Sequence, residues 1–171
     1  MSAACLKALA VAGFKKPEDA LAAVNRAKAA WGMLTTAGNA HGVDPKILAA
    51  LGIRETGFRN ITGDHGHGNG IFQFDDHSYP DARNWAYDPA TAADRAADKV
   101  GGLAQRFSDF GAELATAGAL RSYNAGHVRA TRRMLGQIAS GQATLNKLDR
   151  GTAPGNATYV TDTLAIAKNC F

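Results

Sequence analysis

Alanine and glycine divide the chain into two helical regions and one irregular segment between them. The sequence has 35 alanines, but none lies between Leu51 and Asp81, where six glycines occur instead. Alanine is the strongest helix former and glycine is one of the weakest. The pattern therefore predicts helices on both sides of a single irregular excursion.

Proline residues mark the expected starts of several helices. Pro17, Pro45 and Pro89 stand at or near first helical positions, and Asp44 and Asp88 precede the last two as N-cap residues. Further helices are expected near residues 112–124, 128–139 and 157–168, the last opened by Asn156. The sequence thus predicts one mainly α domain over residues 1–171, with N-terminal helices in residues 1–40 and a small hairpin-like insert.

The irregular segment covers residues 63–75 and has four glycines in its first eight positions. Asn69-Gly70 is a hairpin-turn signal, and residues 71–74 are a candidate for a short strand. Glycine at this density lets the backbone approach another group closely. The alternative is an ordinary flexible loop.

Composition limits the class of protein. With 46% hydrophobic and 20% charged residues, the chain is typical of a folded domain, not of a disordered or fibrous protein. The longest apolar run near the N-terminus, residues 8–14, is too short for a membrane span, and residues 1–14 lack the pattern of a secretory signal. A net charge of +4 favours an anionic partner, which leaves nucleic acid, membrane surface and cell-wall polymer open.

The two cysteines, Cys5 and Cys170, stand at opposite ends of the chain. They are either two reduced, buried thiols or a disulfide that joins the termini, which often lie close together in a compact domain. A disulfide would imply an oxidising destination. Their spacing excludes CxxC redox or zinc chemistry.

Glu55 is the first candidate for catalytic chemistry. It continues the apolar stripe of the helix that starts at Pro45, and it stands near the C-terminus of that helix. Burial and the partial negative charge of a helix C-terminus both raise the pKa of a carboxyl group, which suits a general acid. The alternative is a structural ion pair with Arg54 or Arg59.

Carboxylates and histidines follow Glu55 in the irregular segment. Asp64, Asp75 and Asp76 could supply the second carboxylate that glycoside hydrolysis requires. A competing interpretation is a metal site that combines these carboxylates with histidines, although no metal-binding motif frames them: His65, His67 and His77. No motif indicates a Ser-His-Asp or Cys-His mechanism, and Arg129, Arg132 and Arg133 indicate a solvated helix face more than a DNA-binding one.

Aromatic and amide side chains could line a sugar-binding groove. Tyr123 and Asn124 precede Gly126, so they either form part of an ordinary helix end or belong to a groove wall. Tyr79 and Tyr87 could stack on sugar faces, whereas Trp85 is expected to anchor the core.

Taken in order, these elements resemble one family. Glu55, then Gly63-Asp64 with Asn69-Gly70-Ile71-Phe72-Gln73-Phe74-Asp75, then Tyr123-Asn124-Ala125-Gly126 are similar to the motifs of goose-type lysozyme and, more widely, soluble lytic transglycosylases. The resemblance covers residues 41–168, which would form the catalytic core. It implies a lysozyme-like α-helical domain with a small β-hairpin at its cleft, which cleaves the β-1,4 bond between N-acetylmuramic acid and N-acetylglucosamine without a cofactor or metal.

The resemblance also implies roles for individual residues. Glu55 would be the general acid, and Asp64 and Asp75 would position or activate water in an inverting reaction. The floor of the groove and the neighbourhood of the scissile sugar would be formed by Gly70, Ile71, Phe72, Gln73, Tyr123 and Asn124. Tyr159 resembles the late active-site tyrosine of the family, and Tyr79 stands where goose-type enzymes usually have a histidine near the substrate.

Three functions follow from this comparison. A hydrolase is favoured, because Asp64 and Asp75 give a reason to hold water, whereas a lytic transglycosylase can use a single Glu to form 1,6-anhydro ends. The third is a non-catalytic cell-wall-binding module. The expected partner is the peptidoglycan glycan strand, not nucleic acid, and the protein is expected to act outside the cytoplasm as a monomer without inserting into a membrane. A protein inhibitor or immunity protein is left open.

Overall fold

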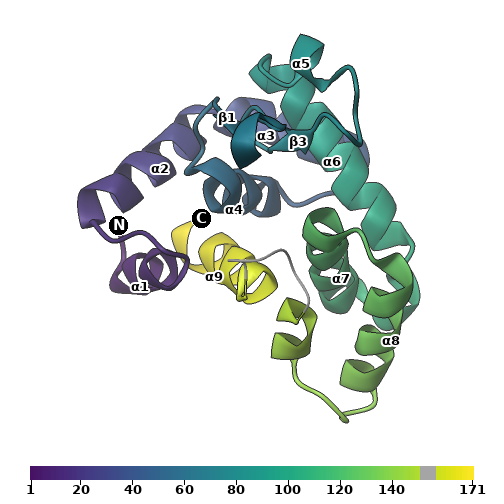
Figure 1. Cartoon of the computed structure of the whole chain (residues 1–171). Coiled ribbons are helices and arrows are strands. Elements are labelled where there is room, and N and C mark those ends of the chain that lie inside the picture. Colours follow the sequence, from purple (N-terminus) through teal and green to yellow (C-terminus); the bar gives the residue numbers. More distant parts are fainter. Residues whose placement is uncertain (151–156) are drawn as a thin grey trace.

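The computed structural model describes residues 1–150 and 157–171, and over these residues it is mainly helical (Figure 1). The N-terminal half contains α1 (Ala3–Val11), α2 (Pro17–Ala29), α3 (Trp31–His41) and α4 (Pro45–Thr56). The rest contains α5 (Ala82–Trp85), α6 (Pro89–Gln105), α7 (Ala112–Ala125), α8 (Val128–Ala139) and α9 (Tyr159–Cys170). The prediction of a mainly α fold is confirmed.

Helix α4 lies at the centre of the fold. It contacts α2, α3, α6 and α9, and Figure 1 places it between the small sheet on one side and α9 on the other. Eight of its twelve residues are buried, among them Leu48, Leu51 and Ile53. Alanine is the commonest buried residue in α2 and α6, and such small side chains let helices approach closely. The residues of α4 therefore have little freedom to move.

The predicted helix starts at Pro17, Pro45 and Pro89 are confirmed. The Asp44 carboxylate accepts a hydrogen bond from the backbone NH of Lys46 at 2.9 Å, and the Asp88 carboxylate accepts one from the NH of Thr91 at 3.0 Å. These N-caps satisfy NH groups that have no partner within their helix. The last helix starts at Tyr159, two residues later than predicted, and its expected opener Asn156 lies outside the described residues.

A three-stranded antiparallel sheet follows α4, with the order β1 (Thr62–Gly63), β2 (Gly68–Asn69) and β3 (Phe74–Asp75). A short 3₁₀ helix, Asp64–Gly66, connects β1 to β2. Gly63 pairs with Gly68, and Asn69 pairs with Phe74. The hairpin turn is therefore formed by residues 70–73, and the prediction of a turn at Asn69-Gly70 with a strand over residues 71–74 was wrong.

The buried side chain of Asn69 explains this difference. Its amide donates hydrogen bonds to the carbonyl oxygens of His67 at 2.7 Å and Phe74 at 3.0 Å, which hold Asn69 within the strand ladder. The turn begins one residue later at Gly70, which adopts a φ of +74°. The side chains of Ile71 and Phe72 are then directed into the core, where 5% and 0% of their surfaces are exposed.

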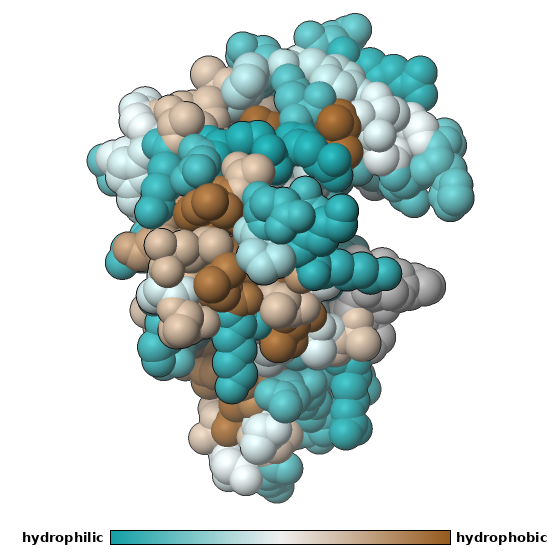
Figure 2. Space-filling model, turned by 90° about the vertical axis from the view of Figure 1, so that its left-hand side faces the viewer, coloured by the Kyte–Doolittle hydropathy of each residue, from teal (hydrophilic) through white to brown (hydrophobic). Residues whose placement is uncertain are grey.

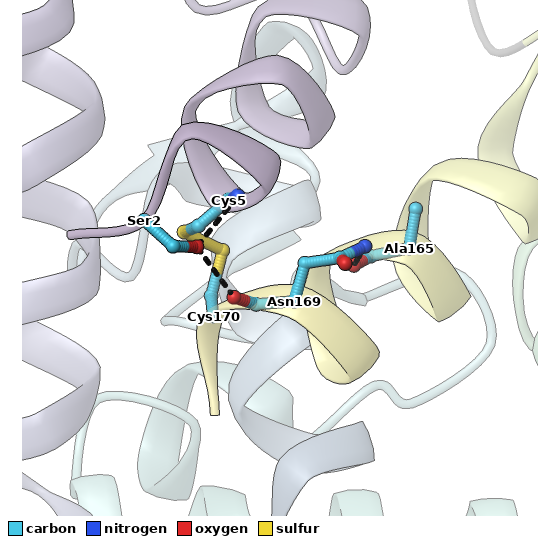
Figure 3. Close-up of a disulfide and its surroundings, with 5 residues drawn as sticks. All are labelled: Ser2, Cys5, Ala165, Asn169 and Cys170. Atoms are coloured by element: carbon cyan, nitrogen blue, oxygen red, sulfur yellow. Dashed lines mark hydrogen bonds between the residues drawn. A yellow bond between two sulfur atoms is a disulfide. The ribbon is translucent and has the colours of Figure 1, made fainter.

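The two chain termini are joined by a disulfide between Cys5 in α1 and Cys170 in α9 (Figure 3). Their Cα atoms are 4.8 Å apart. The Ser2 hydroxyl lies beside the disulfide, where it accepts a hydrogen bond from the NH of Cys5 and donates one to the carbonyl of Asn169. Of the two interpretations of the cysteines, the disulfide is confirmed and the pair of reduced thiols was wrong.

The outer face on the side of α1 and α2 carries both hydrophobic and hydrophilic side chains (Figure 2). In Figure 2, hydrophobic side chains on this face lie among hydrophilic ones, and the outline of the molecule is hollowed at the right-hand edge. Among residues 1–150 and 157–171, no helix has both the length and the apolar character needed to span a membrane.

We predict that the disulfide contributes strongly to stability, because it closes a loop across a sequence separation of 165 residues. In the chain-entropy model, a loop of this length stabilises the folded state by about 5 kcal/mol. The double variant Cys5→Ala/Cys170→Ala should therefore unfold at a clearly lower urea concentration than the wild type.

Addition of a thiol reductant is the control for this experiment. It should lower the urea midpoint of the wild type toward that of the double variant and leave the variant unchanged. Equal midpoints for the oxidised wild type and the double variant would show that the disulfide adds no stability.

Candidate active-site cleft

Glu55 is held at the last turn of α4. The helix ends at Gly57, which adopts a left-handed conformation with a φ of +64° that suits glycine. Arg26 of α2 fixes this end further, because its guanidinium donates two hydrogen bonds to the Gly57 carbonyl at 2.8 and 3.1 Å. The backbone at Glu55 is thus held by the core on one side and by α2 on the other.

The Glu55 carboxylate accepts a hydrogen bond from the hydroxyl of Tyr159, which is 1% exposed and comes from α9. The two arginines nearby have other partners. Arg54 lies 3.6 Å from Asp162 and over the ring of Tyr159, and Arg59 donates to the carbonyl of Thr56 at 2.9 Å. No ion pair within the described residues includes Glu55, so the interpretation of Glu55 as half of a structural ion pair was wrong.

Burial raises the pKa of Glu55 from its ordinary value of 4.5 to about 7. The hydrogen bond from Tyr159 and the positive charges of Arg54 and Lys99 lower this pKa and offset part of the effect of burial. A carboxyl group with a pKa near 7 is protonated in a large fraction of molecules at neutral pH. Glu55 therefore has the property that a general acid requires.

Two open clefts meet at Glu55. The first, which we call the tyrosine cleft, has a volume of about 1030 Å³, and its walls include Tyr79 and Tyr123. The second, which we call the basic cleft, has a volume of about 720 Å³ and extends toward the turn between α1 and α2. Both clefts are lined by Glu55, Asp64 and Gln73. The two clefts are therefore adjacent at these three residues.

The two predicted catalytic aspartates both line the tyrosine cleft. Asp64 is exposed and starts the 3₁₀ helix between β1 and β2. Asp75 ends β3. Burial is the largest single effect on its pKa and raises it, but the hydrogen bonds from the NH and ring of His77 and from the Ser78 hydroxyl together outweigh burial. The pKa of Asp75 is therefore below its ordinary value. At neutral pH this carboxylate is negative while much of Glu55 is neutral.

The glycines of the loop make room for Gln73. The Gln73 side chain lies across the paired residues Gly63 and Gly68, where an added Cβ would come within 2.1 and 2.3 Å of its Oε1 atom. Its amide nitrogen donates to the carbonyls of Gly70 at 2.8 Å and Ile61 at 3.2 Å. Gly63 and Gly68 are thus explained by close approach of a side chain to the sheet.

Three residues predicted to form the groove floor lie elsewhere. Gly70, Ile71 and Phe72 are buried and are not among the described residues that line either cleft. An added Cβ at Gly70 would lie 2.0 Å from the carbonyl oxygen of Ala86, so this glycine is required for packing. The Phe72 carbonyl accepts a hydrogen bond from the Tyr123 hydroxyl at 2.9 Å. These residues therefore belong to the core next to the tyrosine cleft, and Phe72 holds the hydroxyl of Tyr123, which lines that cleft.

The other predicted binding residues lie at or next to the clefts. Tyr79, Tyr123 and Asn124 line the tyrosine cleft, whereas Tyr159 lies behind Glu55 in the core. Of the remaining aromatic candidates, Trp85 is buried as expected. Tyr87 is absent from the described lining of both clefts and donates its hydroxyl hydrogen to Asn69 at 3.1 Å.

Lys99 of α6 belongs to the tyrosine cleft but was not identified from the sequence. Its ammonium lies 4.1 Å from the ring centroid of Tyr123 and 5.3 Å from that of Tyr79, which are cation–π contacts. Burial lowers the pKa of Lys99, and the charges of Glu55 and Asp75 raise it. The only signal in the sequence is a lysine beside the apolar stripe of its helix, and such lysines usually extend to solvent.

A histidine and carboxylate cluster lies beside the sheet. His67 Nδ1 is 2.8 Å from Asp76 Oδ1, and the potential ligand atoms of His67, Asp76 and His77 all lie within 4.8 Å of one another. Arg83 donates to the other oxygen of Asp76 at 2.8 Å and already supplies a positive charge there. Through Asp76, the cluster links the residue before β2 to the residues after β3 and to Arg83 of α5.

Comparisons with known proteins assign no family to the chain. No protein-family model matches the chain, and no curated protein gives a significant match to it.

We predict that Glu55 makes the stability of the protein depend on pH. A carboxyl group whose pKa rises on folding stabilises the folded state fully below its unfolded pKa, and this contribution is lost as pH rises through the folded pKa. A rise from 4.5 to about 7 corresponds to about 3 kcal/mol. The unfolding free energy of Glu55→Gln relative to the wild type should therefore increase between about pH 5 and pH 8.

Urea denaturation at several pH values measures this difference. Glu18→Gln is the matched control, because it makes the same chemical change at an exposed glutamate in α2. A difference between Glu55→Gln and the wild type that is constant with pH would contradict the raised pKa.

Proposed function

We propose that the protein is a peptidoglycan-degrading glycoside hydrolase with a lysozyme-like fold, similar to goose-type lysozyme. The observation that carries this proposal is Glu55, a carboxyl group with a pKa of about 7 at the junction of two open clefts. Its position at the end of a central helix, next to a small antiparallel sheet, also supports the proposed lysozyme-like identity.

Glu55 would act as the general acid. Its proton would pass to the oxygen that bridges N-acetylmuramic acid and N-acetylglucosamine, so that this oxygen leaves as a neutral hydroxyl. The hydrogen bond from Tyr159 fixes the orientation of the carboxyl group and favours its charged form after the proton has left. Tyr159 is thus a positioning residue and does not line the groove.

Asp64 and Asp75 would complete the hydrolytic reaction. Both line the same cleft as Glu55, and the low pKa of Asp75 keeps it negative at neutral pH. A negative carboxylate can hold a water molecule and accept its proton as the water attacks the anomeric carbon. This arrangement favours hydrolysis over the transglycosylase reaction, in which the 6-hydroxyl of muramic acid attacks.

The walls of the tyrosine cleft suit a sugar chain. Tyr79 presents a ring to the cleft, and Gln73 and Asn124 line it with amide side chains. Aromatic faces and a few polar groups are typical of such binding sites. Peptidoglycan lies outside the cytoplasm, and a disulfide between the termini suits that oxidising setting.

We predict that Glu55→Gln abolishes the release of muropeptides from purified sacculi, because glutamine cannot donate the proton. Wild-type products should end in reducing N-acetylmuramic acid when analysed by mass spectrometry. Products with anhydro ends, which lack one water, would instead assign a transglycosylase. Sacculi left intact by the wild type would indicate a non-catalytic wall-binding module.

Two aspartate variants test the water-positioning role in the same assay. Asp64→Asn and Asp75→Asn should each lower the rate by about 10²-fold, which is typical of the loss of a group that takes up a proton. The double variant should be slower than either. Asp109→Asn is the control, because Asp109 pairs with Arg132 and is not among the residues that line the tyrosine cleft. Wild-type rates in Asp64→Asn and Asp75→Asn would remove these residues from the mechanism.

We also predict that kcat/KM of the wild type falls as pH rises through about 7, where Glu55 loses its proton. Tyr159→Phe removes a hydrogen bond that lowers the Glu55 pKa, so it should move this alkaline limb to higher pH. Tyr87→Phe removes the same atom from a tyrosine that does not contact Glu55, and it should leave the limb in place. Coincident profiles for Tyr159→Phe and the wild type would contradict the positioning role.

A further inference from the structure

Two histidines and an aspartate meet beside the small sheet. His67 precedes β2, and Asp76 and His77 follow β3. The backbone NH of Asp76 donates to the carbonyl of His67 at 3.0 Å, which extends the pairing of β2 with β3. The rings of His67 and His77 lie against each other, with their centroids 4.1 Å apart. The backbone of the sheet thus brings two imidazoles and one carboxylate together.

The donor atoms of these three residues have nearly the spacing of a metal site. Asp76 Oδ1 lies 2.8 Å from His67 Nδ1 and 3.9 Å from His77 Nδ1, and one donor atom from each residue lies within 4.8 Å of the others. Neighbouring ligand atoms around a tetrahedral zinc ion are about 3.3 Å apart. Small rotations of the two histidine side chains, which are 44% and 69% exposed, are therefore enough to direct all three atoms to one ion.

The surroundings of the three residues also suit a cation. Arg83 donates to Oδ2 of Asp76 at 2.8 Å, whereas Oδ1 faces the histidines. A hydrogen bond to the outer oxygen of a carboxylate is a common support for a carboxylate that binds a metal. Asp75 and Asp76 together carry two negative charges against the single positive charge of Arg83. Arg83 therefore leaves both the ligand oxygen and a net negative charge available.

The types of donor atom indicate the kind of metal. Imidazole nitrogens suit transition-metal ions such as zinc, whereas magnesium and calcium favour oxygen ligands. Each ring can bind a metal through Nδ1 when Nε2 carries the ring hydrogen. We propose that His67, Asp76 and His77 bind a divalent transition-metal ion, with Zn²⁺ as the best match and water as its fourth ligand.

The proposed metal site is separate from the proposed reaction. None of its three residues is among the described residues that line the tyrosine cleft or the basic cleft. An ion at this position would instead connect the residue before β2 to the residues after β3. Because each strand has only two residues, such a connection would stabilise the sheet that carries Asp75.

Isothermal titration calorimetry of the untagged protein with ZnCl₂ at neutral pH tests the site without requiring catalysis. We expect the wild type to bind one Zn²⁺ per chain, and to bind Mg²⁺ far more weakly. His67→Gln/His77→Gln should weaken Zn²⁺ binding by more than about 100-fold, because the loss of a partner that only supports a ligand already costs about 10- to 100-fold. Zn²⁺ should also raise the thermal unfolding midpoint of the wild type but not that of this variant.

His65→Gln/His127→Gln is the matched control. It removes two exposed histidines that do not belong to the proposed site, and it should leave the affinity for Zn²⁺ unchanged. The ring ¹⁵N resonances of the histidines identify the ligands in the wild type without any substitution. Zn²⁺ should shift the Nδ1 resonances of His67 and His77 and leave those of His65 and His127 in place.

Equal Zn²⁺ affinities of the wild type and His67→Gln/His77→Gln, or the absence of binding by the wild type, would overturn the metal site. An equal loss of affinity in the control variant, or Zn²⁺-dependent shifts at other histidines instead, would also overturn it. The result is independent of the proposed function. A wild type that binds Zn²⁺ through His67 and His77 but leaves sacculi intact would support the metal site and overturn the hydrolase.

Discussion

The chemistry proposed for this protein depends on the burial of one carboxyl group at the end of a central helix. Glu55 lies at the end of α4 in the lining of both clefts, and the partial burial of its carboxyl group raises its pKa to about 7. The fold supports this costly arrangement from two distant parts of the chain. Arg26 of α2 binds the last turn of α4, and Tyr159 of α9 donates a hydrogen bond to the carboxylate itself. Functional sites often contain a residue, such as this buried carboxyl group, that lowers the stability of the folded protein.

The small sheet forms the opposite side of the site. It is stabilised by close packing of side chains, because its strands are very short. Each strand has only two residues, and an isolated sheet of this size would not be stable. The Gln73 side chain fills the space above Gly63 and Gly68, and Asn69 bonds to both neighbouring segments. These contacts fix the loop that carries Asp64 and Asp75, so both carboxylates project into the groove from a defined backbone.

Local sequence signals predicted the helices and the raised pKa of Glu55, but they could not predict contacts between distant segments. Proline and aspartate mark helix starts through interactions within one turn, so the starts of α4 and α6 were correct. The need for glycine at position 70 comes instead from close contact with the carbonyl of Ala86. The position of the Lys99 ammonium depends on its contacts with the rings of Tyr79 and Tyr123. The basic cleft was also missed, because its charges come from segments around α2 and around the end of α4 that are distant in the sequence.

The link between Cys5 and Cys170 makes the backbone, in effect, a closed ring. A single cut by a protease at any bond between these cysteines would open the ring but would not release a fragment, because the disulfide still connects both pieces. The two pieces would also remain packed through α4, which contacts helices from both halves of the chain. A single cut between the two cysteines is therefore not expected to separate the chain into two molecules.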